Sequence, residues 1–119
     1  MQPQKVGGDV FVFLEQTGGR LEGVSLEVLG KAREIADGLG ARVTGVLLGD
    51  VGMEDVAEDC TRRGANTVLL GESSLLKDFT TETYSKVISE VLKERDPDIL
   101  LIGATHNGTT LAGSLAIKG

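Results

Sequence analysis

Four short runs of apolar residues alternate along the chain with longer stretches in which apolar residues recur at helical spacing. The first run, Val10 to Leu14, is too continuous for a strand with one solvated face and predicts a strand buried on both sides. The other runs cover residues 42–48, 67–70 and 98–102. Because buried strands alternate with amphipathic stretches, the pattern predicts an α/β fold with a parallel sheet, helices on both faces and right-handed crossovers.

The helices predicted between these strands have recognisable ends. Apolar spacing over residues 24–39 predicts a first helix, and Gly40 supplies a left-handed stop. A short second helix covers residues 53–60, and a third over residues 84–92 fits the i, i+3, i+4, i+7 template. Pro97 keeps the chain before the fourth strand out of helical geometry.

The last predicted element changes the picture of the whole fold. After Gly103 a polar loop leads to Leu111 and Leu115, which begin another amphipathic helix. Since a strand–helix unit normally returns to the sheet, the pattern predicts a fold that is truncated at its C-terminal side. Residues 1–119 are therefore interpreted as a single α/β domain that is the N-terminal part of a longer protein.

Composition and charge exclude several classes of partner. The formal net charge of −6 repels phosphate backbones and anionic lipid, so nucleic acid is not an expected partner. No apolar run approaches the ~20 residues that a membrane-spanning helix needs, so membrane insertion is not expected. The single cysteine, Cys60, cannot form an internal disulfide, which together with a polar N-terminus indicates a cytoplasmic location. One cysteine and one histidine exclude a structural zinc site.

Three segments of the sequence resemble a known family. They are Val-Phe-Val-Phe-Leu-Glu-Gln at 10–16 with Gly-Gly-Arg-Leu at 18–21, the helical stretch 24–36, and Pro-Asp-Ile-Leu-Leu-Ile-Gly-Ala-Thr-His-Asn-Gly at 97–108. Taken in this order, they cover nearly the whole chain and resemble the N-terminal domain of electron transfer flavoprotein α subunits.

The resemblance implies a three-layer, adenine-nucleotide-hydrolase-like (Rossmann-like) sandwich that pairs with the β subunit of an electron transfer flavoprotein as a heterodimer. It implies that FAD is bound by a C-terminal domain, absent here, which carries electrons from acyl-CoA or related dehydrogenases, as in fatty acid β-oxidation. This chain would then be a scaffold without a catalytic site or flavin of its own. The family usually continues with basic residues where this chain has Thr109 to Ser114, which leaves any charged contact there unsupported.

One loop carries the most suggestive chemistry. It follows a predicted strand and opens a helix, where backbone N–H groups can hold a phosphate of AMP or ATP. The loop has neither the Walker A nor the Gly-x-Gly-x-x-Gly pattern. The alternative interpretation is that its glycines permit the turn while Thr109 or Thr110 caps the helix. The candidate cofactor-binding residues are Gly103, Thr105, His106, Asn107, Gly108 and Thr109.

Two other functions compete with the scaffold. A free-standing universal-stress-type module would bind ATP or AMP at this loop. An enzyme of the same broad fold is disfavoured by the shortage of His, Cys and clustered carboxylates near strand ends. His106 itself has only Asn107 nearby as a partner for general base chemistry. Cys60 and Tyr84 lie at apolar spacing and are interpreted as core residues. The acidic residues of the second helix favour its dipole and predict no metal site.

Overall fold

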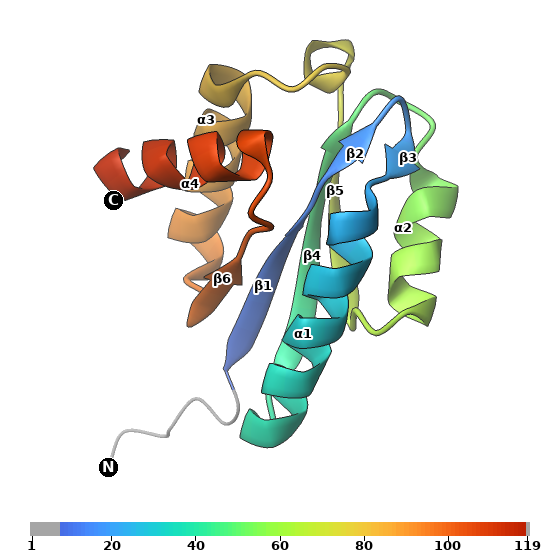
Figure 1. Ribbon diagram of the computed structural model, residues 1–119, viewed down its shortest axis with the longest axis vertical. Coiled ribbons are helices and arrows are strands. Elements are labelled where there is room, and N and C mark those ends of the chain that lie inside the picture. Colours follow the sequence, from blue (N-terminus) through green and yellow to red (C-terminus); the bar gives the residue numbers. More distant parts are fainter. Residues whose placement is uncertain (1–7, 119) are drawn as a thin grey trace.

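A four-stranded parallel sheet forms the middle layer of the molecule (Figure 1). We describe it from a computed structural model that covers residues 8–118; the polar residues 1–7 and residue 119 lie outside the description. The strands are β1 (Asp9–Leu14), β4 (Arg42–Gly49), β5 (Thr67–Glu72) and β6 (Ile99–Leu101), in the order β5-β4-β1-β6. β1 pairs with β4 over six residue pairs and with β6 over three.

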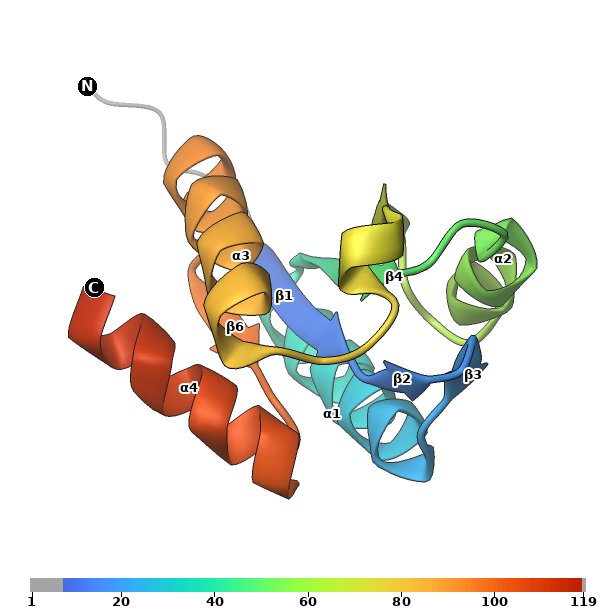
Figure 2. The ribbon, with the colours of Figure 1, turned by 90° about the horizontal axis from the view of Figure 1, so that it is seen from above.

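Helices cover both faces of this sheet, as predicted (Figure 2). Helices α1 (Gly23–Leu39) and α2 (Glu54–Arg62) contribute to one apolar cluster, while α3 (Thr81–Arg95) and α4 (His106–Lys118) contribute to the other. The predicted parallel α/β sandwich is therefore confirmed. None of the helices in residues 8–118 is long and apolar enough to span a membrane.

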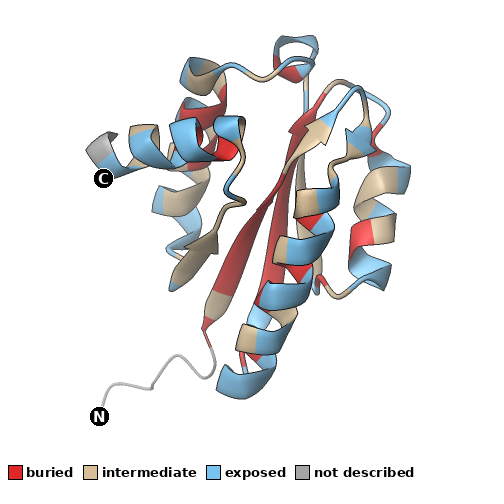
Figure 3. Cartoon of the chain, viewed as in Figure 1, coloured by how far each residue is buried: buried red, intermediate tan, exposed pale blue. Residues whose placement is uncertain are grey.

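The burial of β1 explains why its sequence is apolar at consecutive positions. Val10, Val12 and Leu14 belong to the cluster beneath α1 and α2, and Phe11 and Phe13 belong to the cluster beneath α3 and α4. Successive side chains of a strand point to opposite faces, so a strand covered on both faces needs an apolar residue at every position. Figure 3 shows this central strand buried along most of its length.

The predicted helix ends lie close to the observed ones. Gly40 has φ 66° and its N–H donates to the carbonyl oxygen of Ala36, which ends α1 in the left-handed conformation. Asp96 ends α3 in the same conformation, with φ 49°, directly before Pro97. Aspartate tolerates this region better than most residues because its short polar side chain can bond locally.

Arg33 connects α1 to the start of the two neighbouring strands. Its Nη1 donates to the carbonyl oxygen of Gly64 at 2.9 Å and to Oδ1 of Asn66 at 3.0 Å. The same Asn66 oxygen accepts the backbone N–H of Val43 at 2.8 Å. One guanidinium group therefore holds the C-terminal half of α1 against the beginnings of β4 and β5.

Two small elements were not predicted. Strands β2 (Gln16–Thr17) and β3 (Arg20–Leu21) form a hairpin, which the Gln16 side chain fastens by donating to Leu48 O and accepting from Gly19 N. A single 3₁₀ turn, η1 (Ser74–Leu76), follows β5. Elements of two or three residues are too short to show a hydrophobic period.

Cys60 and Tyr84 are core residues, as predicted. Cys60 is fully buried, and burial raises the pKa of its thiol to about 11, with a smaller contribution from the neighbouring Asp59 carboxylate. Tyr84 is buried too, and its hydroxyl donates to the carbonyl oxygens of Leu76 at 2.6 Å and Leu48 at 3.3 Å. Tyr84 thus anchors η1 to the end of β4.

Candidate functional site

The strand order places the candidate loop where ligands bind in folds of this kind. The direction of chain progression reverses at β1, because β4 and β5 follow on one side of it and β6 lies on the other. In open α/β sheets the crevice beyond the carboxyl ends of the two strands at such a point is the usual ligand site. Glu15 leaves β1 at this point, and residues 103–109 leave β6 there.

Thr105 and Glu15 meet at this crevice. The hydroxyl of Thr105 donates to Oε1 of Glu15 at 2.6 Å and accepts the N–H of Gly108 at 2.9 Å. Thr105 therefore caps α4, which begins at His106. The expectation that Thr109 or Thr110 caps this helix was wrong: both lie inside it, and Thr109 N donates to Thr105 O at 2.8 Å.

Gly108 is required by a close approach of the backbone. A β-carbon at this position would lie 2.1 Å from the carbonyl oxygen of Gly103, far inside contact distance. Gly103 is also tight, since a β-carbon there would meet the Val24 side chain at 2.7 Å. Neither glycine has a positive φ. Gly108 therefore allows the first turn of α4 to pack on the segment that follows β6, and Gly103 allows that segment to pack on α1; neither glycine supplies a left-handed turn.

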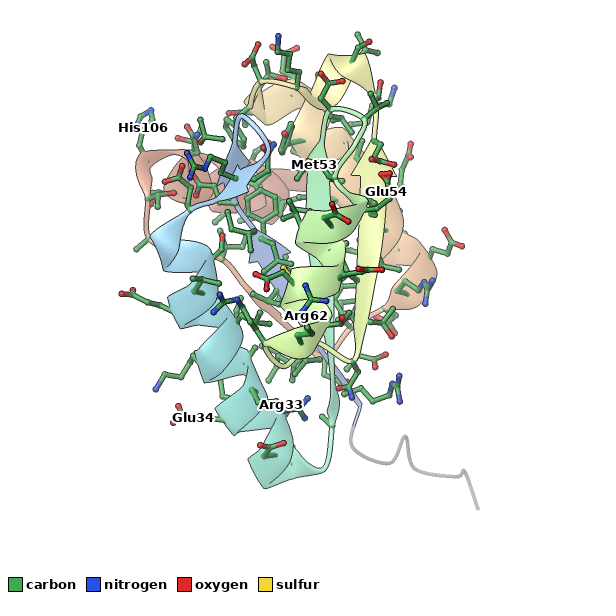
Figure 4. All side chains as sticks on the ribbon, turned by 90° about the vertical axis from the view of Figure 1, so that its right-hand side faces the viewer. Arg33, Glu34, Met53, Glu54, Arg62 and His106 are labelled. Carbon is green, nitrogen blue, oxygen red and sulfur yellow. The ribbon has the colours of Figure 1, made fainter. Side chains whose placement is uncertain are left out.

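The remaining candidate residues of the loop do not point toward one common site. His106 is exposed, and Figure 4 shows it projecting away from the body of the molecule. Asn107 is half-buried, and Thr109 is exposed on the first turn of α4. Within residues 8–118, no side chain forms a hydrogen bond with the imidazole that could orient it for proton transfer.

A carboxylate also lies at the start of α2, where it accepts backbone amides directly. Oε2 of Glu72, at the end of β5, accepts the N–H groups of Gly52 at 2.7 Å and Met53 at 2.9 Å. Beside it, a hollow of about 340 Å³ lies between the hairpin turn and the loop after β4. Its lining residues are Gln16, Gly18, Gly19, Asp50, Val51, Gly52, Met53 and Lys77.

These contacts bear on whether the carboxyl edge of the sheet can bind an anion or a metal ion. A phosphate at the start of α4 would lie near the acidic side chain of Glu15, and two unit negative charges ~4 Å apart repel by roughly 4 kcal/mol at an effective dielectric constant near 20. The start of α2 already holds the carboxylate of Glu72. Within residues 8–118 no group of three or more His, Cys, Asp or Glu side chains is arranged to hold a metal ion.

Sequence reasoning located the loop but missed both of these carboxylates. Glu15 is 90 residues from Thr105, and Glu72 is 19 residues from Met53. Glu15 directly follows β1 and Glu72 is the last residue of β5, so a search for acidic residues at strand ends would have found both.

Comparison with known proteins identifies the family. The sequence profile described as "Electron transfer flavoprotein domain" matches residues 10–118. The chain belongs to the electron transfer flavoprotein domain family. The predicted resemblance to the N-terminal domain of the α subunits is thereby confirmed.

Two curated relatives show how much of a whole subunit this domain represents. It is 45% identical to "Electron transfer flavoprotein subunit alpha" of Clostridium acetobutylicum, over 92% of this chain and 32% of that protein. It is 36% identical to "Acryloyl-CoA reductase electron transfer subunit beta" of Anaerotignum propionicum, over 92% of this chain and 30% of that protein. The electron transfer flavoprotein domain described here thus spans about a third of the length of these relatives.

A solved structure supports the fold alone. The domain superimposes on a universal stress protein in complex with cAMP with a TM-score of 0.62, covering 94% of this chain and 90% of that chain. Their sequence identity is 17%, so the likeness extends to the arrangement of strands and helices and not to the ligand.

Proposed function

We propose that this chain is the scaffold and subunit-pairing domain at the N-terminus of an electron transfer flavoprotein α subunit. It pairs with the β subunit, has no catalytic site and does not bind flavin by itself. FAD is bound by the part of the α subunit beyond this domain. The observation that carries the proposal is the 45% identity to an α subunit across 92% of this chain.

The geometry of the candidate loop supports the scaffold over a nucleotide-binding module. In a phosphate site the first amides of the helix and the space before them are open to the ligand. Here Thr105 takes the Gly108 amide, and the carboxylate of Glu15 is hydrogen-bonded to Thr105. The loop is therefore held by interactions within the chain, and its charge disfavours AMP, ATP and the diphosphate of FAD.

The proposed electron-transfer partners of the complete protein are suggested by the name of one relative. One relative carries the name of an acryloyl-CoA reductase electron transfer subunit. We therefore assign the complete protein to electron exchange with dehydrogenases or reductases of acyl-CoA thioesters. The domain contributes to this exchange indirectly, by holding the two subunits together.

Two binding measurements test the proposal. The first is a thermal-shift series with FAD, AMP and ATP, in which a ligand at a hundredfold its Kd adds ~2.7 kcal/mol to stability. We expect no shift with the wild-type chain. A shift with AMP or ATP that grows in Glu15→Gln, which removes the repelling charge, would make the loop a nucleotide site and contradict the scaffold assignment.

The second measurement is complex formation with an electron transfer flavoprotein β subunit, followed by sedimentation velocity. We expect a 1:1 complex between the tagged chain and the β subunit. The chain mixed with an unrelated universal stress protein of the same size is the control. If the β subunit sediments alone at micromolar concentrations of both proteins, the proposal that this chain pairs with it is wrong.

A further inference from the structure

The carbonyl oxygen of Leu48 lies where β4 extends past the end of β1. The register of the two strands ends at the pair Leu14 and Leu47, and the chain then leaves β1 for the hairpin of β2 and β3. Gly49 O accepts from Ser73 N on the β5 side, so by alternation the Leu48 carbonyl is directed at the side that β1 has left. A buried carbonyl needs a hydrogen-bond partner, and here no strand supplies one.

Two side chains from distant parts of the chain satisfy this carbonyl. Nε2 of Gln16, in the hairpin, donates to Leu48 O at 3.0 Å, and the hydroxyl of Tyr84, in α3, lies 3.3 Å from the same oxygen. The hydroxyl donates more closely to Leu76 O, in η1, at 2.6 Å. Oε1 of Gln16 accepts Gly19 N, at the hairpin turn, at 2.8 Å. Burial raises the pKa of Tyr84, and a hydrogen bond from the Gln16 side chain opposes that rise.

The hairpin and η1 therefore share one buried polar network. Leu48, Leu76 and Tyr84 are each at most 5% exposed. If the hairpin detaches, Leu48 O and the Tyr84 hydroxyl lose Gln16, and water takes its place. That water can also solvate the hydroxyl when Leu76 O leaves it, so the second detachment costs less free energy than the first.

The same two elements form walls of one hollow. The hollow of about 340 Å³ is lined by Gln16, Gly18 and Gly19 of the hairpin, by the loop 50–53, and by Lys77, the C-cap of η1. Figure 1 shows the hairpin and the yellow turn of η1 at the same end of the sheet. The shape of the hollow thus depends on both elements being in place.

We propose that the hairpin of β2 and β3 and the turn η1 form one conformational unit, which opens and closes around the hollow as a whole because Gln16 and Tyr84 share Leu48 O. In the sequence the two elements are separated by α1, β4, α2 and β5, so without the network each would open independently. A ligand or protein that contacts only the closed hairpin therefore stabilises η1 as well, since it shifts the population of the whole unit.

Amide hydrogen exchange measured by NMR on the 119-residue chain tests this coupling. Glu22 N, which donates to Glu15 O at 3.0 Å across the base of the hairpin, reports on the hairpin. Leu76 N, which donates to Ser73 O at 2.9 Å, reports on η1. Val12, paired on both sides in the central strand, reports on unfolding of the whole domain.

Two conservative variants each cut the network from one side. Gln16→Glu keeps the oxygen that accepts Gly19 N but replaces the donor to Leu48 O, and Tyr84→Phe removes only the hydroxyl. We expect Gln16→Glu to accelerate exchange of the Leu76 amide, and Tyr84→Phe that of the Glu22 amide, each by about three- to tenfold. Because both bonds belong to one network, each amide in the double variant should exchange within about twofold of its rate in the faster single variant.

Ser25→Ala is the matched control. The Ser25 hydroxyl donates to Glu15 O at 2.7 Å, beside the hairpin but outside the network, so its loss should leave exchange of the Leu76 amide unchanged. The proposal is wrong if Gln16→Glu accelerates only the hairpin amide and Tyr84→Phe only the η1 amide, or if the two effects multiply in the double variant. Equal acceleration of the Val12 amide would also overturn it, because the bonds would then stabilise the whole domain and not a unit within it.

Discussion

Replacing Gly108 by alanine tests whether the first turn of α4 is held by a close backbone approach. The new β-carbon would lie 2.1 Å from the Gly103 carbonyl oxygen, about 1.3 Å short of the 3.4 Å at which ordinary contact begins. It would also lie 3.1 Å from both Ile102 Cγ2 and Thr105 Oγ1. The obstacle at 2.1 Å is backbone, so a rotamer change cannot relieve the overlap.

The expected free energy combines opposing contributions. Alanine gains about 1 kcal/mol over glycine from helix propensity. Overpacking costs about 1–3 kcal/mol, with the upper end appropriate for a backbone obstacle. Displacing the first turn also breaks the Thr105 cap, which costs about 1 kcal/mol more. We expect a net loss of about 1–3 kcal/mol, which corresponds to a fall in Tm of about 4–12 °C for a domain of this size.

Gly113→Ala is the matched control in the same helix. Nothing lies within 4 Å of a β-carbon at position 113, and the residue is exposed. This variant should gain about 0.5–1 kcal/mol from propensity alone, so its Tm should rise by about 2–4 °C. Thermal unfolding followed by circular dichroism measures both. If Gly108→Ala melts at or above the temperature of Gly113→Ala, the close approach is not what selects glycine there.

Two further predictions concern the body of the domain. Arg33→Ala should lower the free energy of unfolding by about 1–2 kcal/mol in urea titrations, because the half-buried Gly64 carbonyl and the exposed Asn66 amide oxygen both lose a charged donor. Lys31→Ala, which loses only an exposed ion pair, should stay within about 0.5 kcal/mol of wild type. For Cys60, the folded chain retains the thiol proton to a pKa of about 11 while the unfolded thiol ionises near 9.0. Stability should therefore fall as pH rises from 9 to 11, and Cys60→Ala should remove that part of the pH dependence; an identical slope in both chains would contradict it.

The elements that sequence predicts well are those whose burial is uniform. β1 is apolar at five consecutive positions because both of its faces are covered, which is the pattern typical of a strand inside a parallel sheet. The hairpin of β2 and β3 is different, because Gln16 and Gly19 fix it through one side chain that also bonds Leu48. That bond connects residues that are 32 apart in the sequence, and no local pattern predicts it.

At the candidate site, residue type alone does not predict which threonine caps α4. Thr105, Thr109 and Thr110 are equally good caps by residue type, so the sequence around them cannot choose. The choice is made by the first turn of α4, which packs on Gly103, and by Glu15, which binds the hydroxyl of Thr105 from another strand. The order of the elements predicts where the loop lies. The negative charge beside the loop comes from Glu15, which is distant in the sequence and reaches Thr105 only in the folded sheet.

The short pairing of β6 with β1 also orders the events of folding. Pairing β1 with β4 joins residues 33 apart, whereas Asp9 and Asp98 are 89 apart and their strands share only three pairs. By the logarithmic dependence of loop-closure entropy, the longer closure costs about 0.9 kcal/mol more and is followed by half as many backbone pairs. We expect β1, α1 and β4 to form the folding nucleus, and β6 with α4 to dock last and to detach first when the domain opens locally.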